Sequence, residues 1–361
     1  MTKVSVLTST FRPGGLDITL AGMRDQTFKD FELIIVDKRY DKRHKEVMQL
    51  AKEYGVKTIH VPEHRTNGKW NTFCSAWNTA FALAQGELFI ILGDYMYLHP
   101  GTIEAHLRAH EVENRYVLAP YIYTDMPAFK KPYTKDLKNQ MYRGTLCTDN
   151  DDVLNGGVIE EMFAFRDGPF DASWIPNLPP SLPPDQDIRA GYYPQGRYLD
   201  STSGIGWVHV KYESAPRSLY YKYNGLDERM ERGKGPMDLD LETRIILGGV
   251  NVWWDPSVPP GISPNPRWYC RSMPWGTMNE RLQGRWSYDD GLTYIERRKT
   301  EIKAAKTQKE QEQAVRAKNL YSLEELSERL APWRSEENHP VRSIDVDDMV
   351  YWGKELWPDT P

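Results

Sequence analysis

Residues 70–101 read WNTFCSAWNTAFALAQGELFIILGDYMYLHPG, and this stretch decides the fold. Its first half, residues 70–85, repeats aromatic and small apolar residues three or four positions apart, which predicts an amphipathic helix with one buried face. Its second half contains an apolar run, residues 88–92, that stops at Gly93 and Asp94. An aspartate that follows a buried strand is typical of open α/β sheets, which bind their ligands at the carboxyl ends of their strands.

Short runs of β-forming residues alternate with helical patterns through the first third of the chain. The predicted strands cover residues 3–7, 32–36, 57–61, 88–92 and 116–119. The predicted helices cover residues 17–26, 42–54, 70–85 and 100–113. Because parallel strands need crossover connections, this alternation predicts an α/β fold with a mostly parallel sheet and helices on both of its faces.

The composition predicts one large folded domain with additions, since 40% of the 361 residues are hydrophobic and 27% are charged. A formal net charge of -5 gives no overall attraction to nucleic acid or to an anionic membrane. No apolar run approaches the roughly 20 residues that span a bilayer, so we expect no membrane span and a cytoplasmic protein. Three widely separated cysteines indicate neither a disulfide framework nor a zinc site.

Four further motifs accompany the stretch described first. They are VSVLTSTFRP at residues 4–13, FELIIVD at 31–37, YNGLDE at 223–228 and GPMDLDLETR at 235–244. With residues 70–101, the first two resemble the nucleotide-sugar domain of family-2 glycosyltransferases with the GT-A fold. The last two resemble the stretch of that family that carries its catalytic base.

The resemblance spans residues 3–254 and implies a Rossmann-like GT-A sheet. It implies transfer of a sugar, with inversion, from a UDP-linked nucleoside-diphosphate sugar to an acceptor hydroxyl. Residues 1–120 are then the nucleotide-sugar-binding half of the domain, and residues 121–290 are its acceptor-binding and catalytic half. The charged composition beyond that point predicts an α-helical C-terminal extension over residues 291–361.

The resemblance assigns donor binding to turns at the strand ends and to the helix that begins at residue 70. An acid after the second strand receives the base N–H in this family, and Asp37 stands there. Lys69 follows a turn glycine, where an ammonium group suits a phosphate as a point charge. The predicted nucleotide-sugar-binding residues are Thr8, Thr10, Arg12, Asp37, Lys69, Asn78 and Asp94.

The family also implies a divalent cation, held by an Asp-x-Asp motif shortly before a His-Pro-Gly turn. The aligned residues here are Gly93-Asp94-Tyr95-Met96, which retain one carboxylate. We therefore expect Mn2+ or Mg2+ to depend on Asp94, since hard cations prefer carboxylate oxygens and offset the charge of a leaving diphosphate. A literal Asp-x-Asp at residues 149–151 follows no buried strand, and we interpret it as a polar turn.

Asp238 matches the catalytic base of the family, because an inverting displacement needs one carboxylate that faces the acceptor hydroxyl. Its alternative role is that of a helix N-terminal cap. Asp240 matches a second acid, which the helix dipole favours in a first turn. Aromatic rings of the loop-rich second half suit sugar faces, although covering a core is an equally good interpretation. The predicted acceptor-binding residues are Asp240, Trp207, Trp254, Trp268 and Arg271.

Other functions stay open at this point. A nucleotide-sugar-binding protein without turnover is one, since the metal motif has lost an acid. A second is a glycosyltransferase whose acceptor is modified DNA rather than a glycan, with the basic stretch Arg297–Lys318 as the contact. Sugar-phosphate nucleotidyltransfer is disfavoured, because no glycine-rich phosphate loop follows the first strand.

Overall fold

The structure is a computed structural model, and it describes residues 3–10, 16–37, 40–66, 73–93, 96–112, 115–123, 197–199, 210–232, 236–263, 288–335 and 344–345. Its strands are β1 (Val4–Thr10), β2 (Phe31–Asp37), β3 (Thr58–Val61), β4 (Arg65–Thr66), β5 (Leu88–Leu92), β6 (Arg115–Leu118), β7 (Tyr121–Tyr123), β8 (Arg197–Leu199), β9 (Tyr212–Pro216), β10 (Asn251–Trp254), β11 (Gly261–Ser263) and β12 (Ile344–Asp345). Its helices are α1 (Leu16–Arg24), α2 (Tyr40–Glu53), α3 (Phe73–Leu83), α4 (Thr102–Ala109), α9 (Arg217–Tyr223), α10 (Met237–Leu247), α13 (Tyr288–Ala304), α14 (Gln308–Ala314) and α15 (Leu323–Leu330), with 3-10 helices η3 (Glu228–Arg232) and η4 (Ala331–Arg334).

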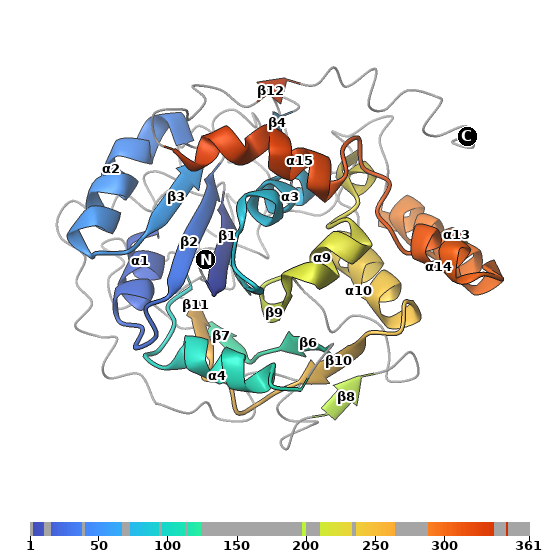
Figure 1. The fold of residues 1–361 in the computed structure, drawn as a ribbon, viewed down its shortest axis with the longest axis horizontal. Helices are drawn as coiled ribbons and strands as arrows, with labels where there is room; N and C mark the ends of the chain where they lie inside the picture. Colours follow the sequence, from blue (N-terminus) through green and yellow to red (C-terminus); the bar gives the residue numbers. More distant parts are fainter. Residues whose placement is uncertain are drawn as a thin grey trace, which may run out of the picture.

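The central sheet of the described residues has the strand order β3-β2-β1-β5-β9-β6-β10-β8. β3, β2, β1 and β5 pair in parallel, and so do β6 and β10. β9 runs antiparallel to both of its neighbours, and β8 runs antiparallel to β10. Helices cover the sheet on both sides (Figure 1). The predicted mostly parallel α/β sheet with flanking helices is confirmed.

Two apolar cores fill the two faces of this sheet, because successive strand residues point to opposite sides. On β2, Ile34 and Val36 belong to the core shared with α3, α10, α13 and α15, whereas Leu33 and Ile35 belong to the core shared with α1, α2 and α4. The helix predicted over residues 70–85 is observed as α3, and its aromatic stripe is buried in the first of these cores.

Within residues 291–335 the C-terminal extension is helical, as predicted, and its helices pack on the same face of the sheet as α3 and α10. α13 begins at Tyr288 and so crosses the predicted boundary at residue 290. The basic stretch Arg297–Lys318 is divided between two helices, α13 and α14, rather than forming one. Among the described helices, none has both the length and the apolar composition that crossing a bilayer requires.

Candidate functional site

Polar residues gather where β1 and β2 end at the carboxyl edge of the sheet. Thr10 lies opposite Asp37 in the parallel register, and Thr8 lies two residues earlier on the same face of β1. All three side chains are buried. The hydroxyl of Thr8 has no hydrogen-bond partner within the described part of the chain. The structure thus brings together three of the predicted donor-binding residues at the edge where such sheets bind ligands.

Asp37 is held as a carboxylate by two neighbours. Arg43 on α2 donates from Nε to Oδ2 at 2.6 Å and from Nη2 to Oδ1 at 2.8 Å. His60 on β3 contacts Oδ2 through Nε2 at 3.0 Å. Burial by itself raises the pKa of Asp37, but the Arg43 charge and these hydrogen bonds outweigh it and hold the pKa well below its usual range.

Arg43 and His60 were not predicted from the sequence. The ring of His44 stacks on that of His60 with centroids 5.2 Å apart, and the Tyr40 ring is tilted against it at 5.3 Å, so His60 is itself packed against α2. The signal that could have indicated a partner on β2 is His60, a titratable residue between Ile59 and Val61 on β3. Arg43 follows Asp37 by six positions and has no sequence pattern that marks it.

Asp238 occupies the first turn of α10 and is half-buried. Burial raises the pKa of its carboxyl group, and the hydrogen bond from the Leu239 backbone N–H at 2.9 Å offsets part of that effect. The N-cap position of α10 is Pro236, so Asp238 is not the cap residue, although its carboxylate accepts from a backbone N–H of the first turn. A raised pKa makes the carboxylate of Asp238 a stronger base than an exposed aspartate.

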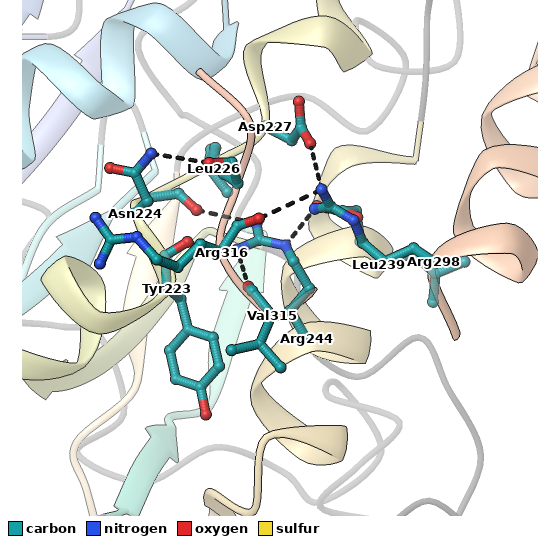
Figure 2. Close-up of polar contacts among 12 residues, drawn as sticks. Tyr223, Asn224, Leu226, Asp227, Leu239, Arg244, Arg298, Val315 and Arg316 are labelled. Carbon is teal, nitrogen blue, oxygen red and sulfur yellow. Dashed lines mark hydrogen bonds and ion pairs between the residues drawn. The ribbon is translucent and has the colours of Figure 1, made fainter. Parts of the chain in front are cut away.

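Asp240 lies two residues further along α10 and is fully buried between two arginines. Arg244, one turn later, donates from Nε to Oδ2 at 2.8 Å. Arg298 of α13 approaches Oδ1 with Nη1 at 3.4 Å. Figure 2 shows Arg244 of α10 and Arg298 of α13 beside one another, with Arg298 reaching Asp227. The structure therefore gives Asp240, predicted as an acceptor contact, two internal cationic partners.

Asn78 connects α3 to the segment that leads into η3. Its side-chain amide donates to the Leu226 carbonyl and to Glu228 Oε1, both at 2.9 Å, and its carbonyl oxygen accepts from the Leu226 N–H at 2.9 Å. Glu228 also lies 3.4 Å from His64 and 3.3 Å from Arg65. The predicted donor contact Asn78 thus lies in a buried polar cluster that joins the two halves of the domain.

The remaining predicted residues divide into two groups. Trp254 ends β10 fully buried in the core that contains α3 and α10. The others lie outside the described residues: Arg12, Lys69, Asp94, Trp207, Trp268 and Arg271. Within the part of the chain that the structure describes, no group of three His, Cys, Asp or Glu side chains could hold a metal ion. The predicted dependence on Asp94 remains a prediction.

The chemistry available to this arrangement follows from its two acids. Asp37 stays charged at the edge of the sheet and can accept hydrogen bonds. Burial raises the pKa of Asp238 above its ordinary value, which makes its carboxylate a stronger proton acceptor than an exposed one.

Comparisons with known proteins agree with these observations at the level of a family. The model of the family described as glycosyl transferase family 2 matches residues 5–174. No curated protein matches the chain.

Solved structures resemble the chain at low identity. Residues 1–349 of TarS from S. aureus share 11% identity at a TM-score of 0.41, with 86% of this chain and 77% of that chain covered. The same TarS fragment in complex with UDP-GlcNAc gives 11% identity and 0.44, with 87% and 70% covered. The mannosyltransferase PcManGT from Pyrobaculum calidifontis, in complex with GDP-Man and Mn2+, gives 14% and 0.43, with 92% and 71% covered. Likeness at these values assigns no substrate to this chain.

Proposed function

We propose that this chain transfers a sugar from a nucleoside-diphosphate sugar to an acceptor hydroxyl, because the model of glycosyl transferase family 2 matches its residues 5–174. The family match carries the proposal. The buried polar residues at the ends of β1 and β2 support it, since they lie at the edge where open α/β sheets bind ligands.

In the proposed reaction Asp238 is the general base. It removes the proton of the acceptor hydroxyl while that oxygen attacks the anomeric carbon, and the nucleoside diphosphate leaves from the opposite face, so the configuration inverts. The raised pKa of Asp238 supports this role, because a base works best with a pKa close to the operating pH.

The donor in this proposal is UDP-linked. Asp37 receives the base N–H, Thr8 and Thr10 line the same edge, and Arg12 and Lys69 neutralise the diphosphate. Asp94 supplies the one carboxylate ligand for Mn2+ or Mg2+, and a bound cation offsets charge on the leaving diphosphate. With one such acid, we expect metal to bind only together with nucleotide, whose oxygens complete its shell. Acceptor contacts are assigned to Trp207, Trp268 and Arg271.

The experiment is release of nucleoside diphosphate from a panel of UDP-, GDP- and dTDP-linked sugars, with water as the acceptor, in Mn2+, in Mg2+ and in excess EDTA. We expect slow release from a UDP-sugar with Mn2+ or Mg2+. The Asp94→Ala variant should lose the stimulation by metal. Full activity in EDTA would instead show that the cationic side chains stabilise the leaving group without metal.

Two alternatives are decided by the same panel. Tight binding of UDP without turnover of any donor, in the presence of glycan acceptors as well, would show a nucleotide-sugar-binding protein. Turnover that appears only with DNA containing a hydroxylated base, and that falls steeply with salt, would identify a nucleic-acid acceptor. The absence of both nucleotide binding and turnover would overturn the proposal.

A further inference from the structure

Arg298 is an unusual residue on α13. It is almost fully buried, whereas its neighbour Arg297 is exposed and its neighbour Lys299 is half-buried. Its Nη2 lies 3.1 Å from Asp227 Oδ2, and its Nη1 lies 3.4 Å from Asp240 Oδ1. One guanidinium of the C-terminal extension therefore bridges two buried carboxylates of the catalytic half.

Each of these carboxylates has a further arginine of its own. Asp227 is bonded by Arg229, whose Nη2 lies 2.6 Å from Oδ2. Asp240 is bonded by Arg244 on the same helix. Arg298 is therefore not needed to neutralise either acid. What it adds is a connection between them, and Figure 2 shows it reaching this place from the neighbouring helix.

The two bridged acids bracket the segment that carries Asp238. Asp227 precedes η3, and Asp240 lies in the first turn of α10, two residues after Asp238. Around the same point Arg244 donates to the carbonyls of Tyr223 at 2.8 Å and Gly225 at 2.9 Å. The start of α10 is thus fixed to the chain before η3 through ionic and backbone contacts.

We propose that Arg298 is a positioning residue of the reaction: by bridging Asp227 and Asp240, it fixes the start of α10 and so the carboxyl group of Asp238. The inference rests on the proposed function of Asp238. Buried charge networks are weak sources of stability but good determinants of register, because other placements leave a charge unpaired. An apolar residue at position 298 would fill the same space without specifying where the first turn of α10 lies.

The test compares Arg298→Lys with Arg297→Lys, a matched control one residue away on the exposed face of α13. A lysine can reach one carboxylate but cannot bridge two with a planar fork. We expect kcat for release of UDP from a UDP-sugar to fall ~10-fold or more, with the Kd for UDP within about twofold, since small displacements of a reacting group are costly. The acid limb of the kcat profile should move to lower pH, because a looser α10 exposes Asp238 to water and lowers its pKa. Arg297→Lys should change none of these.

Amide hydrogen exchange gives a readout that does not depend on turnover. In Arg298→Lys we expect the amides of residues 239–245 to exchange ~10-fold faster, with those of α3 unchanged. If the wild type turns over no nucleotide sugar, the proposed function fails, and faster exchange confined to α10 still supports the bridge. Unchanged amide exchange in α10 of Arg298→Lys would overturn the positioning role. A lowered melting temperature of this variant with an unaltered kcat and pH profile would overturn it as well. Should Arg298→Lys not fold, Asp240→Asn removes the other end of the bridge and is expected to give the same results.

Discussion

Asp37 and Asp238 are both enclosed acids, yet their surroundings move their pKa values in opposite directions. Burial raises both, because it penalises the charged form. Arg43 and His60 reverse the effect at Asp37, whereas backbone N–H groups offset the effect of burial at Asp238 only in part. The pKa of one aspartate therefore lies below its ordinary value and that of the other lies above it.

The Asp238→Asn substitution tests the proposed base. An amide of the same shape cannot take the acceptor proton, so we expect kcat to fall ~100-fold or more while the Kd for UDP stays within about twofold. Steady-state kinetics and calorimetry measure the two quantities. Glu328→Gln, an exposed position on α15, is the control for loss of a carboxylate. Turnover within a few-fold of the wild type would exclude Asp238 as the base.

The Asp37→Asn substitution is expected to destabilise the fold by about 2–4 kcal/mol at pH 7, because it breaks a buried ion pair and leaves Arg43 without its carboxylate. The folded-state pKa of Asp37 lies below its unfolded value. Its contribution is therefore fully present above about pH 4 and is lost as the pH falls further. Urea unfolding at pH 7 and pH 3 should show a smaller difference between the two proteins at the lower pH. An equal difference at both values would mean that the charge of Asp37 contributes nothing.

Single positions were predictable where a strand end or helix start marked them, as for Asp37 and Asp238, whose roles remain predictions. Their partners were not. His60 and Arg298 come from elements whose neighbours in space are set by the assembled sheet, and a local pattern carries no such information. A charged residue on a buried stripe was the available signal for Arg298, since it lies between the buried Ile295 and Ile302 on α13.

At the scale of elements, the strands with continuous apolar runs were found within a few residues of their observed bounds, as for β2 and β5. β9 was missed. Its sequence, YESAP, contains Glu213 and Ser214, both buried, so it lacks the apolar alternation that marks a strand. Its insertion between β5 and β6 depends on pairing between residues more than 90 positions apart, and sequence periodicity carries no information about such pairs.

α4 docks on β9 through two histidines that share one hydroxyl. His106 Nδ1 and His110 Nε2 each lie 2.8 Å from Ser214 Oγ. Burial lowers the pKa of His106 to about 3 and that of His110 to about 4. Both are therefore neutral in the folded protein at pH values where the unfolded chain takes up protons.

This arrangement predicts acid sensitivity above the range in which the carboxylates titrate. The folded pKa values lie below the unfolded value of about 6.5, so the contribution is present above pH 6.5 and is lost as the pH falls toward 4. Each histidine costs about 1.4 kcal/mol per pH unit in that window. We expect His106→Phe to flatten the fall in unfolding free energy between pH 6.5 and 4.5, measured by urea titration. A fall as steep as that of the wild type would contradict the assignment.

At the scale of the molecule, the C-terminal extension contributes to the core. Asn319 donates to the carbonyls of Asn224 and Leu226, both at 2.9 Å, and accepts from the Glu228 N–H at 2.9 Å. Arg334 donates to the buried Glu32 of β2 at 2.5 Å. These contacts join the extension to both halves of the domain. The composition of the chain changes near residue 290, but the packing of the structure continues across that point.

Removal of the extension is therefore expected to abolish cooperative folding. A chain of residues 1–290 loses the Arg298 bridge and exposes the faces of α3 and α10 that six side chains cover: Ile295, Ile302, Leu323, Leu326, Leu330 and Trp333. Burial of each is worth about 1.5–3 kcal/mol, so their sum is at least as large as the about 5–15 kcal/mol by which whole domains are stable. A chain of residues 1–345 keeps every one of these contacts and should melt within a few degrees of the full chain. Calorimetry of the two truncations distinguishes the possibilities, since a sharp transition of residues 1–290 near the full-length melting temperature would mean that the extension folds as a separate unit.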